Sequence, residues 1–202
     1  MRLRGSIAAV TLVLGLAPSG GSAPVVTSVQ PNLGQGATHA LVVVVGFNFA
    51  PGAILSFPAT GITVSQTVTV SKMELHARVT VAPDASPGLY GATVTNPNGL
   101  SGTCEACFTV DPGPKPTQAI PSSAARGASL VVRILGSGFQ DPSAVRFGSG
   151  ITVTSVTFVG ATELDASVAI SANARVGSRT ISVRSATDFG AGSCAGCFTV
   201  TT

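Results

Sequence analysis

The chain contains one sequence unit twice. The first copy includes QPNLGQGATHALVVVVGFNFAPGAILSF, residues 30–57, and the second copy includes IPSSAARGASLVVRILGSGFQDPSAVRF, residues 120–147. Further along, GTCEACFTV in the first copy corresponds to GSCAGCFTV in the second. A repeat of about 90 residues is long enough for a unit with its own small core. The repeat therefore predicts two copies of the same small domain, arranged one after the other.

Residue types in both copies favour strands. Val and Thr occur throughout, and the sequence has 24 Gly and 13 Pro. β-branched side chains pack well on a pleated surface, whereas Gly and Pro interrupt it. The segment ELHARVTV alternates, which places its apolar residues on one face. Short strands are expected in the first copy at residues 25–29, 40–45, 53–57, 62–70, 74–81, 89–95 and 107–110. This pattern predicts an all-β fold of two tandem immunoglobulin-like β-sandwich domains.

The N-terminal 23 residues match the pattern of a secretory signal peptide. Arg2 and Arg4 form a positive start, residues 7–17 form a short apolar core, and small residues follow at positions 20–23. A helix that spans a membrane needs about 20 apolar residues, and this core has about half that number. We therefore expect residues 1–23 to be removed on export and the mature chain to have no membrane span. An uncleaved N-terminal anchor is the alternative.

Domain boundaries follow from the repeat and from one proline-rich segment. We assign residues 24–110 to the first domain and residues 119–202 to the second. Between them lies DPGPKPTQ, residues 111–118. Because proline restricts the backbone, this segment is expected to be a short, extended and fairly stiff linker. The two domains are therefore expected to lie end to end with limited bending.

Three segments of the first copy carry a family pattern: VTSVQPNLGQG, VVVVGFNFAPGAILSF and APDASPGLYGATVTNPNG. With their counterparts in the second copy, they resemble IPT/TIG domains, immunoglobulin-like modules of the E-set type that are found in many extracellular and some intracellular proteins. In this pattern Gly46 is expected to end a core strand, Asn48 to turn the chain in the left-handed conformation, and Phe49 to pack back under the sheets. The counterparts in the second copy are Gly136, Gly138 and Phe139. NARVGSRTISVRSATDFG departs from the family because it lacks the Asn-Pro-x-Gly hairpin, so the shape of that loop stays open.

Each copy has two cysteines separated by two residues, which we interpret as a local disulfide formed after export. The predicted pairs are Cys104–Cys107 and Cys194–Cys197. Residues i and i+3 of a regular strand lie about 10 Å apart, whereas a disulfide needs Cα atoms within about 7 Å of each other. The chain must therefore turn or bulge between the two cysteines of each pair, before the last strand starts. Intermolecular cross-linking is the alternative.

No catalytic, cofactor-binding or metal-binding residues are predicted. A thiol redox motif sits at a helix N-terminus, and a four-cysteine zinc site needs both pairs to converge, although they lie a domain apart. His39 and His76 are the only histidines. The acidic residues Glu74, Glu163 and Asp165 are interpreted as isolated on strands. The sequence encodes no close carboxylate pair, no Asp-rich calcium loop and no Gly-rich phosphate loop. The chain is therefore not expected to be an enzyme.

Charge argues against a nucleic-acid partner. The chain has 11 basic and 8 acidic residues and no basic stripe. The arginines of its second half are interpreted as a scattered, solvated surface. They are Arg126, Arg133, Arg146, Arg175, Arg179 and Arg184. Tyr90 is the only tyrosine and tryptophan is absent, so carbohydrate binding, which usually relies on aromatic rings, is weakly disfavoured.

Three functional hypotheses remain. The first is a secreted or cell-surface interaction or adhesion module whose partner is an unknown protein or a component of the cell envelope. It depends on the family resemblance, because a fold alone does not fix a function. The second is a structural spacer or a self-associating subunit of a surface layer or fibre, since unpaired strand edges are templates for pairing. The third is an accessory domain pair of a secreted polysaccharide-acting system.

Overall fold

The computed structural model describes residues 21–202, which form strands and turns without any helix. All but the last three positions of the predicted signal peptide lie outside the described residues. The strands divide into two groups, which we call the first and the second module. The first module contains β1 (Val25–Gln30), β2 (Leu33–Gly34), β3 (Ala40–Phe47), β4 (Ile54–Ser56), β5 (Ile62–Ser71), β6 (Glu74–Val81), β7 (Gly88–Thr95) and β8 (Ser101–Asp111). The second contains β9 (Lys115–Ile120), β10 (Ser123–Ala125), β11 (Ser129–Ser137), β12 (Ser143–Arg146), β13 (Ile151–Gly160), β14 (Glu163–Ile170), β15 (Gly177–Ser185) and β16 (Ala191–Thr201).

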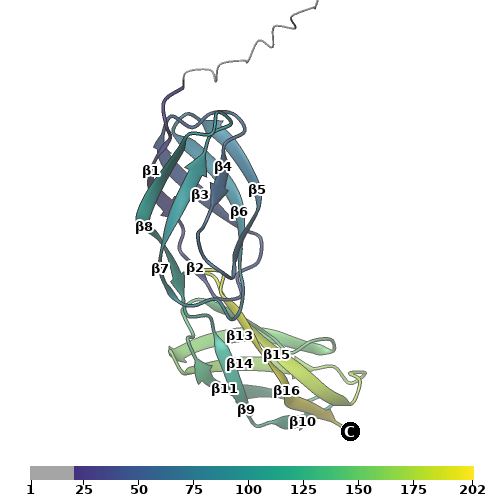
Figure 1. The fold of residues 1–202 in the computed structure, drawn as a ribbon. Coiled ribbons are helices and arrows are strands. Elements are labelled where there is room, and N and C mark those ends of the chain that lie inside the picture. The colour runs from purple at the N-terminus through teal and green to yellow at the C-terminus, as the bar shows by residue number, and fades with distance from the viewer. Residues whose placement is uncertain (1–20) are drawn as a thin grey trace, which may run out of the picture.

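Each module is a sandwich of two four-stranded sheets (Figure 1). In the first module the strand orders are β1-β3-β6-β5 and β2-β8-β7-β4. The second module repeats them as β9-β11-β14-β13 and β10-β16-β15-β12. Neighbouring strands are antiparallel except in the short pairs β2–β8 and β10–β16, which are parallel. The prediction of an all-β fold with tandem immunoglobulin-like sandwiches is confirmed.

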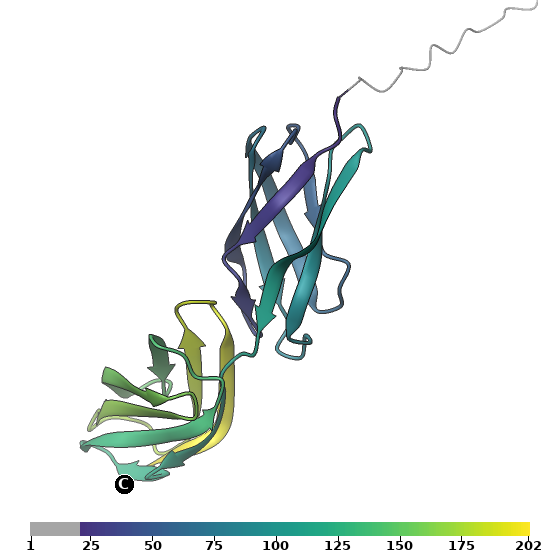
Figure 2. The ribbon, with the colours of Figure 1, turned by 90° about the vertical axis from the view of Figure 1, so that its left-hand side faces the viewer.

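The two modules lie one after the other along the chain. Figure 2 shows the start of β1 at the outer end of the first module and the C-terminus at the outer end of the second. β8 ends at Asp111 and β9 begins at Lys115, so residues 112–114 are the only part of the connection outside the strands. Within residues 21–202, no helix is long and apolar enough to cross a bilayer.

Alternation decides which side chains enter the core of each sandwich. In β6 every second residue is buried, as predicted, and the residues between them face the opposite side of the sheet. An aromatic pair fills the space between the sheets in each module. The ring centroids of Phe57 and Phe108 lie 4.8 Å apart, and those of Phe147 and Phe198 lie 5.3 Å apart. Each module therefore closes its own apolar interior.

The G-x-x-F corner after β3 has the predicted conformation. Asn48 has a φ of 60°, in the left-handed region, and Phe49 is 1% exposed. A Cβ on Gly46 would lie 1.9 Å from the carbonyl oxygen of Val25 and 2.6 Å from the ring of Phe49. Only glycine therefore fits where β1 and the aromatic ring meet the end of β3. The second module repeats this arrangement with Gly136, Gly138 and Phe139.

Two elements differ from the sequence expectation. The alternation pattern does not predict β2, because its two residues pair with β8 over too short a stretch to leave a periodic signal. The last strand, β8, begins at Ser101 rather than at residue 107. The reason is a tight turn, in which the backbone N–H of Asn96 donates to the carbonyl of Leu100 at 2.9 Å and Gly99 has a φ of 83°. β7 and β8 therefore pair from the first residue after the turn, Thr95 opposite Ser101.

Candidate functional site

The cysteines of each module form a local disulfide, Cys104 with Cys107 and Cys194 with Cys197. The Cα atoms of the two pairs lie 5.8 and 5.7 Å apart, within the range that a disulfide allows. Closing so short a loop stabilises the folded state by about 2 kcal/mol in the chain-entropy model. The described residues contain no free cysteine. The cysteines therefore fix the path of the last strand of each module and offer no thiol for chemistry.

The bulge that the disulfides require is present in both modules, but it lies within the last strand rather than before it. In the first module, pairing passes from Tyr90 opposite Phe108 to Ala92 opposite Cys104. The extra residues of β8 face Gly91 alone. A Cβ on Gly91 would come within 2.9 Å of the carbonyl oxygen of Cys104, so the position opposite the bulge must stay small. The pairing of β15 with β16 has an equivalent shift.

The histidines and carboxylates considered from the sequence do not gather into one site. Contrary to the prediction, Glu74 is not isolated. The Oε1 atom of Glu74 lies 2.6 Å from Nε2 of His76. Glu163 is not isolated either, because its Oε1 lies 3.0 Å from Nε of Arg133. Both pairs lie on outer sheet faces, where such contacts contribute at most about 1 kcal/mol. Across residues 21–202, no three His, Cys, Asp or Glu side chains are placed to hold a metal ion.

The two modules meet where the loop between β15 and β16 lies against β2. The backbone N–H of Gly34 donates to the carbonyl of Asp188 at 2.8 Å. The backbone N–H of Ala191 donates to the carbonyl of Gln35 at 2.9 Å. Phe189, from the second module, packs against the apolar core of the first. The loop whose shape the sequence left open is therefore the contact between the modules.

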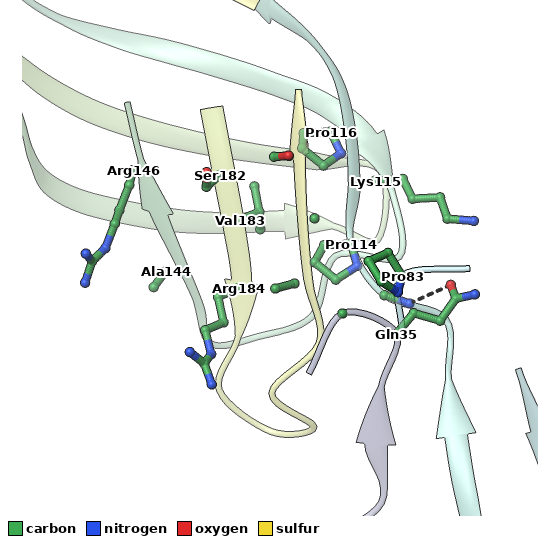
Figure 3. A pocket seen from close by; sticks show the side chains of 15 residues that line it. Gln35, Pro83, Pro114, Lys115, Pro116, Ala144, Arg146, Ser182, Val183 and Arg184 are labelled. Carbon is green, nitrogen blue, oxygen red and sulfur yellow. Dashed lines mark hydrogen bonds between the residues drawn. The ribbon is translucent and has the colours of Figure 1, made fainter. Parts of the chain in front are cut away.

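Gln35 ties the connection between the modules to the first module. Its side chain lies in the junction, and the residue is 6% exposed. Its Nε2 donates to the carbonyl of Ala85 at 2.5 Å, and its Oε1 accepts from the backbone N–H of Gly113 at 3.2 Å (Figure 3). Breaking either hydrogen bond would leave a polar atom unpaired and away from water. The amide therefore holds the connection in one arrangement.

Two carboxylates approach each other at the same junction. Asp188 is 4% exposed, and it accepts hydrogen bonds from Nε2 of Gln140 at 2.8 Å and from the backbone N–H of Gly190 at 2.9 Å. Burial raises the pKa of Asp111, and the negative charge of Asp188 raises it further. The folded chain therefore disfavours the charged form of Asp111.

Asp111→Asn is expected to stabilise the protein at neutral pH. The folded chain holds the Asp111 proton more tightly than the unfolded chain, whose carboxyl has its ordinary pKa of 3.8. Stability therefore falls as the pH rises from that value through the raised pKa, and the amide removes this loss. We expect a melting temperature about 1–3 °C above that of the wild type at about pH 7, and no difference at about pH 3, by circular dichroism. Asp84→Asn changes an exposed carboxylate and is the control, and an equal gain there contradicts the prediction.

Beside the junction lies a groove of about 740 Å³ (Figure 3). Its floor is the outer face of β12, β15 and β16, and one side is formed by Pro114 of the connection and Lys115 at the start of β9. The base of the first module contributes Gln35 and Pro83. The volume falls in the range of about 300–1,000 Å³ that is typical of ligand sites. The first module and the connection thus close one side of a groove whose floor belongs to the second module.

Small residues keep the floor of the groove open. Strand pairing lines up two rows of outward-facing residues across it, Arg146–Ser182–Ser193 and Ala144–Arg184–Ala191. Gly192 allows the connection to lie directly on β16, because a Cβ there would be 1.7 Å from the carbonyl oxygen of Pro114. Arg146 and Arg184 are diagonal neighbours on adjacent strands, roughly 7 Å apart at Cβ.

The groove is positively charged. Its described lining residues include Lys115, Arg146 and Arg184 and contain no carboxylate. The guanidinium of Arg184 also lies 5.9 Å from the ring centroid of Phe189, which connects the groove to the junction loop. The sequence interpretation, that the arginines of the second half are all scattered, is therefore wrong for two of them. The register of β12 and β15 brings two of them together from distant parts of the chain.

The fold and the groove define a protein class, tandem immunoglobulin-like sandwich modules with a cationic groove at their junction. A family model described as quinohemoprotein amine dehydrogenase, alpha subunit domain III, matches residues 117–190. No curated protein matches the chain. Among solved structures, the plexin A4 extracellular region, domains 1 to 10, is similar at 12% identity with a TM-score of 0.48. That likeness covers 96% of this chain and 17% of the plexin chain.

Two further solved structures are also similar. SGBP-B from a complex xyloglucan utilization locus in Bacteroides uniformis has 17% identity and a TM-score of 0.32, over 87% of this chain and 49% of that chain. Domains 5–6 of the S-layer protein SbsC have 15% identity and a TM-score of 0.28, over 88% of this chain and 98% of that chain. At these identities the likeness concerns the fold alone, and such TM-scores carry no argument about function.

Proposed function

We propose that this chain is a non-enzymatic, extracellular interaction module of the IPT/TIG type that engages a component of the cell envelope in its junction groove. The observation that carries the proposal is the groove, a concave surface with a floor of small residues. Buried hydrogen bonds of Gln35 and the packing of Phe189 hold its two sides together. A preformed site lowers the ordering cost of binding, and such sites are where proteins usually hold ligands.

Several features support this assignment. Disulfides persist in oxidising compartments and are rare in the cytosol, and each module has one. The leader pattern of residues 1–23 points to the same compartment. The IPT/TIG assignment rests on the G-x-x-F corner that both modules share. Among the described residues that line the groove there is no His, Cys, Asp or Glu, and the groove supplies mainly cations and hydroxyls.

Ser193→Trp tests whether the groove is the binding surface. Ser193 is exposed on the floor, and Thr103 is its exposed counterpart on β8, outside the groove. We expect labelled residues 24–202 to bind envelope material from the source organism. The tryptophan at position 193 should weaken this binding at least about tenfold, whereas Thr103→Trp should leave it unchanged. Equal effects of the two variants, or no binding by the wild type, contradict the proposal.

One observation favours the structural alternative. β5 and β13 lie at sheet edges, and neither contains a charged residue or a proline. Long uncharged edges are templates for pairing with another chain. Each strand also has two register shifts, which oppose this because bulges twist an edge away from a flat partner. Size-exclusion chromatography of residues 24–202 separates the two functions, since polymers favour the alternative and monomers favour the interaction module.

A further inference from the structure

We infer that the groove binds an acidic polysaccharide, whose carboxylate or sulfate groups pair with Arg146 and Arg184. The inference rests on the proposed function and names the ligand class for the same site. Arg146 and Arg184 line the groove from adjacent strands, and Lys115 lies on the opposite side (Figure 3). A guanidinium presents a planar fork of donors that matches a carboxylate or sulfate group. Two such forks on neighbouring strands bind two anionic groups of one polymer.

The floor of the groove favours a sugar chain over an acidic peptide. A bound extended peptide gains affinity from main-chain hydrogen bonds to a free strand edge. β15 is paired on both sides, by β12 and β16. The open side of β16 at this level is covered by Pro114, and its Ala191 N–H already donates to Gln35. Within this sheet, a free backbone edge at the floor remains on the four-residue strand β12. The centre of the floor, on β15 and β16, therefore offers side chains rather than backbone groups, and the hydroxyls of Ser182 and Ser193 match the hydroxyls of a sugar.

The lining also favours a charged polysaccharide over a neutral one. Neutral sugars are held largely by aromatic rings, and the described residues that line the groove include none. The remaining attractive forces are charge and hydrogen bonding. Exposed charge pairs are screened by salt over about 10 Å at 0.1 M. Binding is therefore expected to weaken steeply as salt is added.

Binding of residues 24–202 to four immobilised polymers tests the ligand class. The probes are polygalacturonate, dextran sulfate, uncharged dextran and poly-L-glutamate, measured by biolayer interferometry. We expect binding to polygalacturonate or dextran sulfate, with the preferred one identifying the anionic group, and a loss of at least about tenfold between about 0.05 and 0.5 M NaCl. Equal binding to dextran overturns the role of charge. Equal binding to poly-L-glutamate overturns the preference for a sugar chain.

A matched pair of variants tests the site. The double change Arg146→Gln and Arg184→Gln should weaken binding to the acidic polysaccharide at least about tenfold. The control, Arg126→Gln with Arg175→Gln, removes the same charge from exposed positions outside the groove and should change binding less than about twofold. Melting curves check that the loss of the Arg184 contact with Phe189 leaves the fold intact. Equal losses in both double variants overturn the inference.

The two proposals fail in different ways. If Ser193→Trp abolishes envelope binding while the arginine double variant retains it, the groove binds a ligand by other means and only the present inference is overturned. If Ser193→Trp has no effect on envelope binding, the proposed function itself is wrong.

Discussion

Phe108→Ala will lower the free energy of unfolding of the first module by about 3–5 kcal/mol. Phe108 is fully buried between the two sheets, where its ring lies 4.8 Å from that of Phe57. Alanine removes most of these contacts and leaves a cavity that the rigid sheets fill only in part. Since domains of this size have total stabilities of about 5–15 kcal/mol, the loss is a large share of what holds the module folded.

Tyr90 makes this measurement specific to one module. The chain has one tyrosine and no tryptophan, and Tyr90 lies opposite Phe108 in the pairing of β7 with β8. Its fluorescence in a urea titration therefore reports the first module alone, while circular dichroism reports both. Phe198→Ala, at the equivalent core position of the second module, is the control and should leave the Tyr90 transition near its wild-type midpoint. A Tyr90 midpoint that moves equally in both variants would show that the two cores do not unfold separately.

Gly46→Ala will destabilise the first module by about 1–3 kcal/mol or more, although it adds a single methyl group. The new Cβ would lie 1.9 Å from a backbone oxygen of Val25 and 2.6 Å from the ring of Phe49. Neither neighbour moves easily, because one belongs to β1 and the other is buried in the core. Gly46 is not among the residues with positive φ, so the cost is steric rather than conformational.

Gly160→Ala is the matched control. A Cβ at this position at the end of β13 meets no atom within 4 Å, and its φ is also not in the left-handed region. We expect its free energy of unfolding to stay within about 0.5 kcal/mol of the wild type. Urea titration by circular dichroism compares the two variants. A loss at Gly160 as large as at Gly46 would exclude the steric explanation.

Much of the fold is predictable because its signals are local. Alternation in β6 identifies the buried face, and the Asn-Gly turn identifies the hairpin that follows β7. The bulge in β8 follows from the spacing of Cys104 and Cys107 and from the geometry of a disulfide. β2 is not predictable in this way, because its short parallel pairing with β8 depends on where the chain returns after the rest of the module has formed.

The groove is not predictable from the sequence alone because it depends on register and on the module junction. Arg146 and Arg184 become neighbours only through the pairing of β12 with β15. Lys115 joins them because Gly192 lets the connection, with Pro114, lie against β16. The first module adds Gln35 and Pro83 to the groove only because of the contacts at the junction. The segments SAVR and SVR each combine small residues with one arginine, and this pattern is visible in the sequence. It gains meaning only when the two strands are placed side by side.

The loop between β15 and β16 gives the duplicated chain a direction. In the first module the corresponding turn is a compact Asn-Pro-Asn-Gly segment that faces away from the second module, whereas the second module has Asp188 and Phe189 there, seated on its neighbour. If the two copies were exchanged, that aromatic side chain would face water. The Asn-Pro-Asn-Gly turn, which has no aromatic side chain to insert, would then lie against the base of the other copy. The repeats have thus become distinct parts whose order is encoded in one loop.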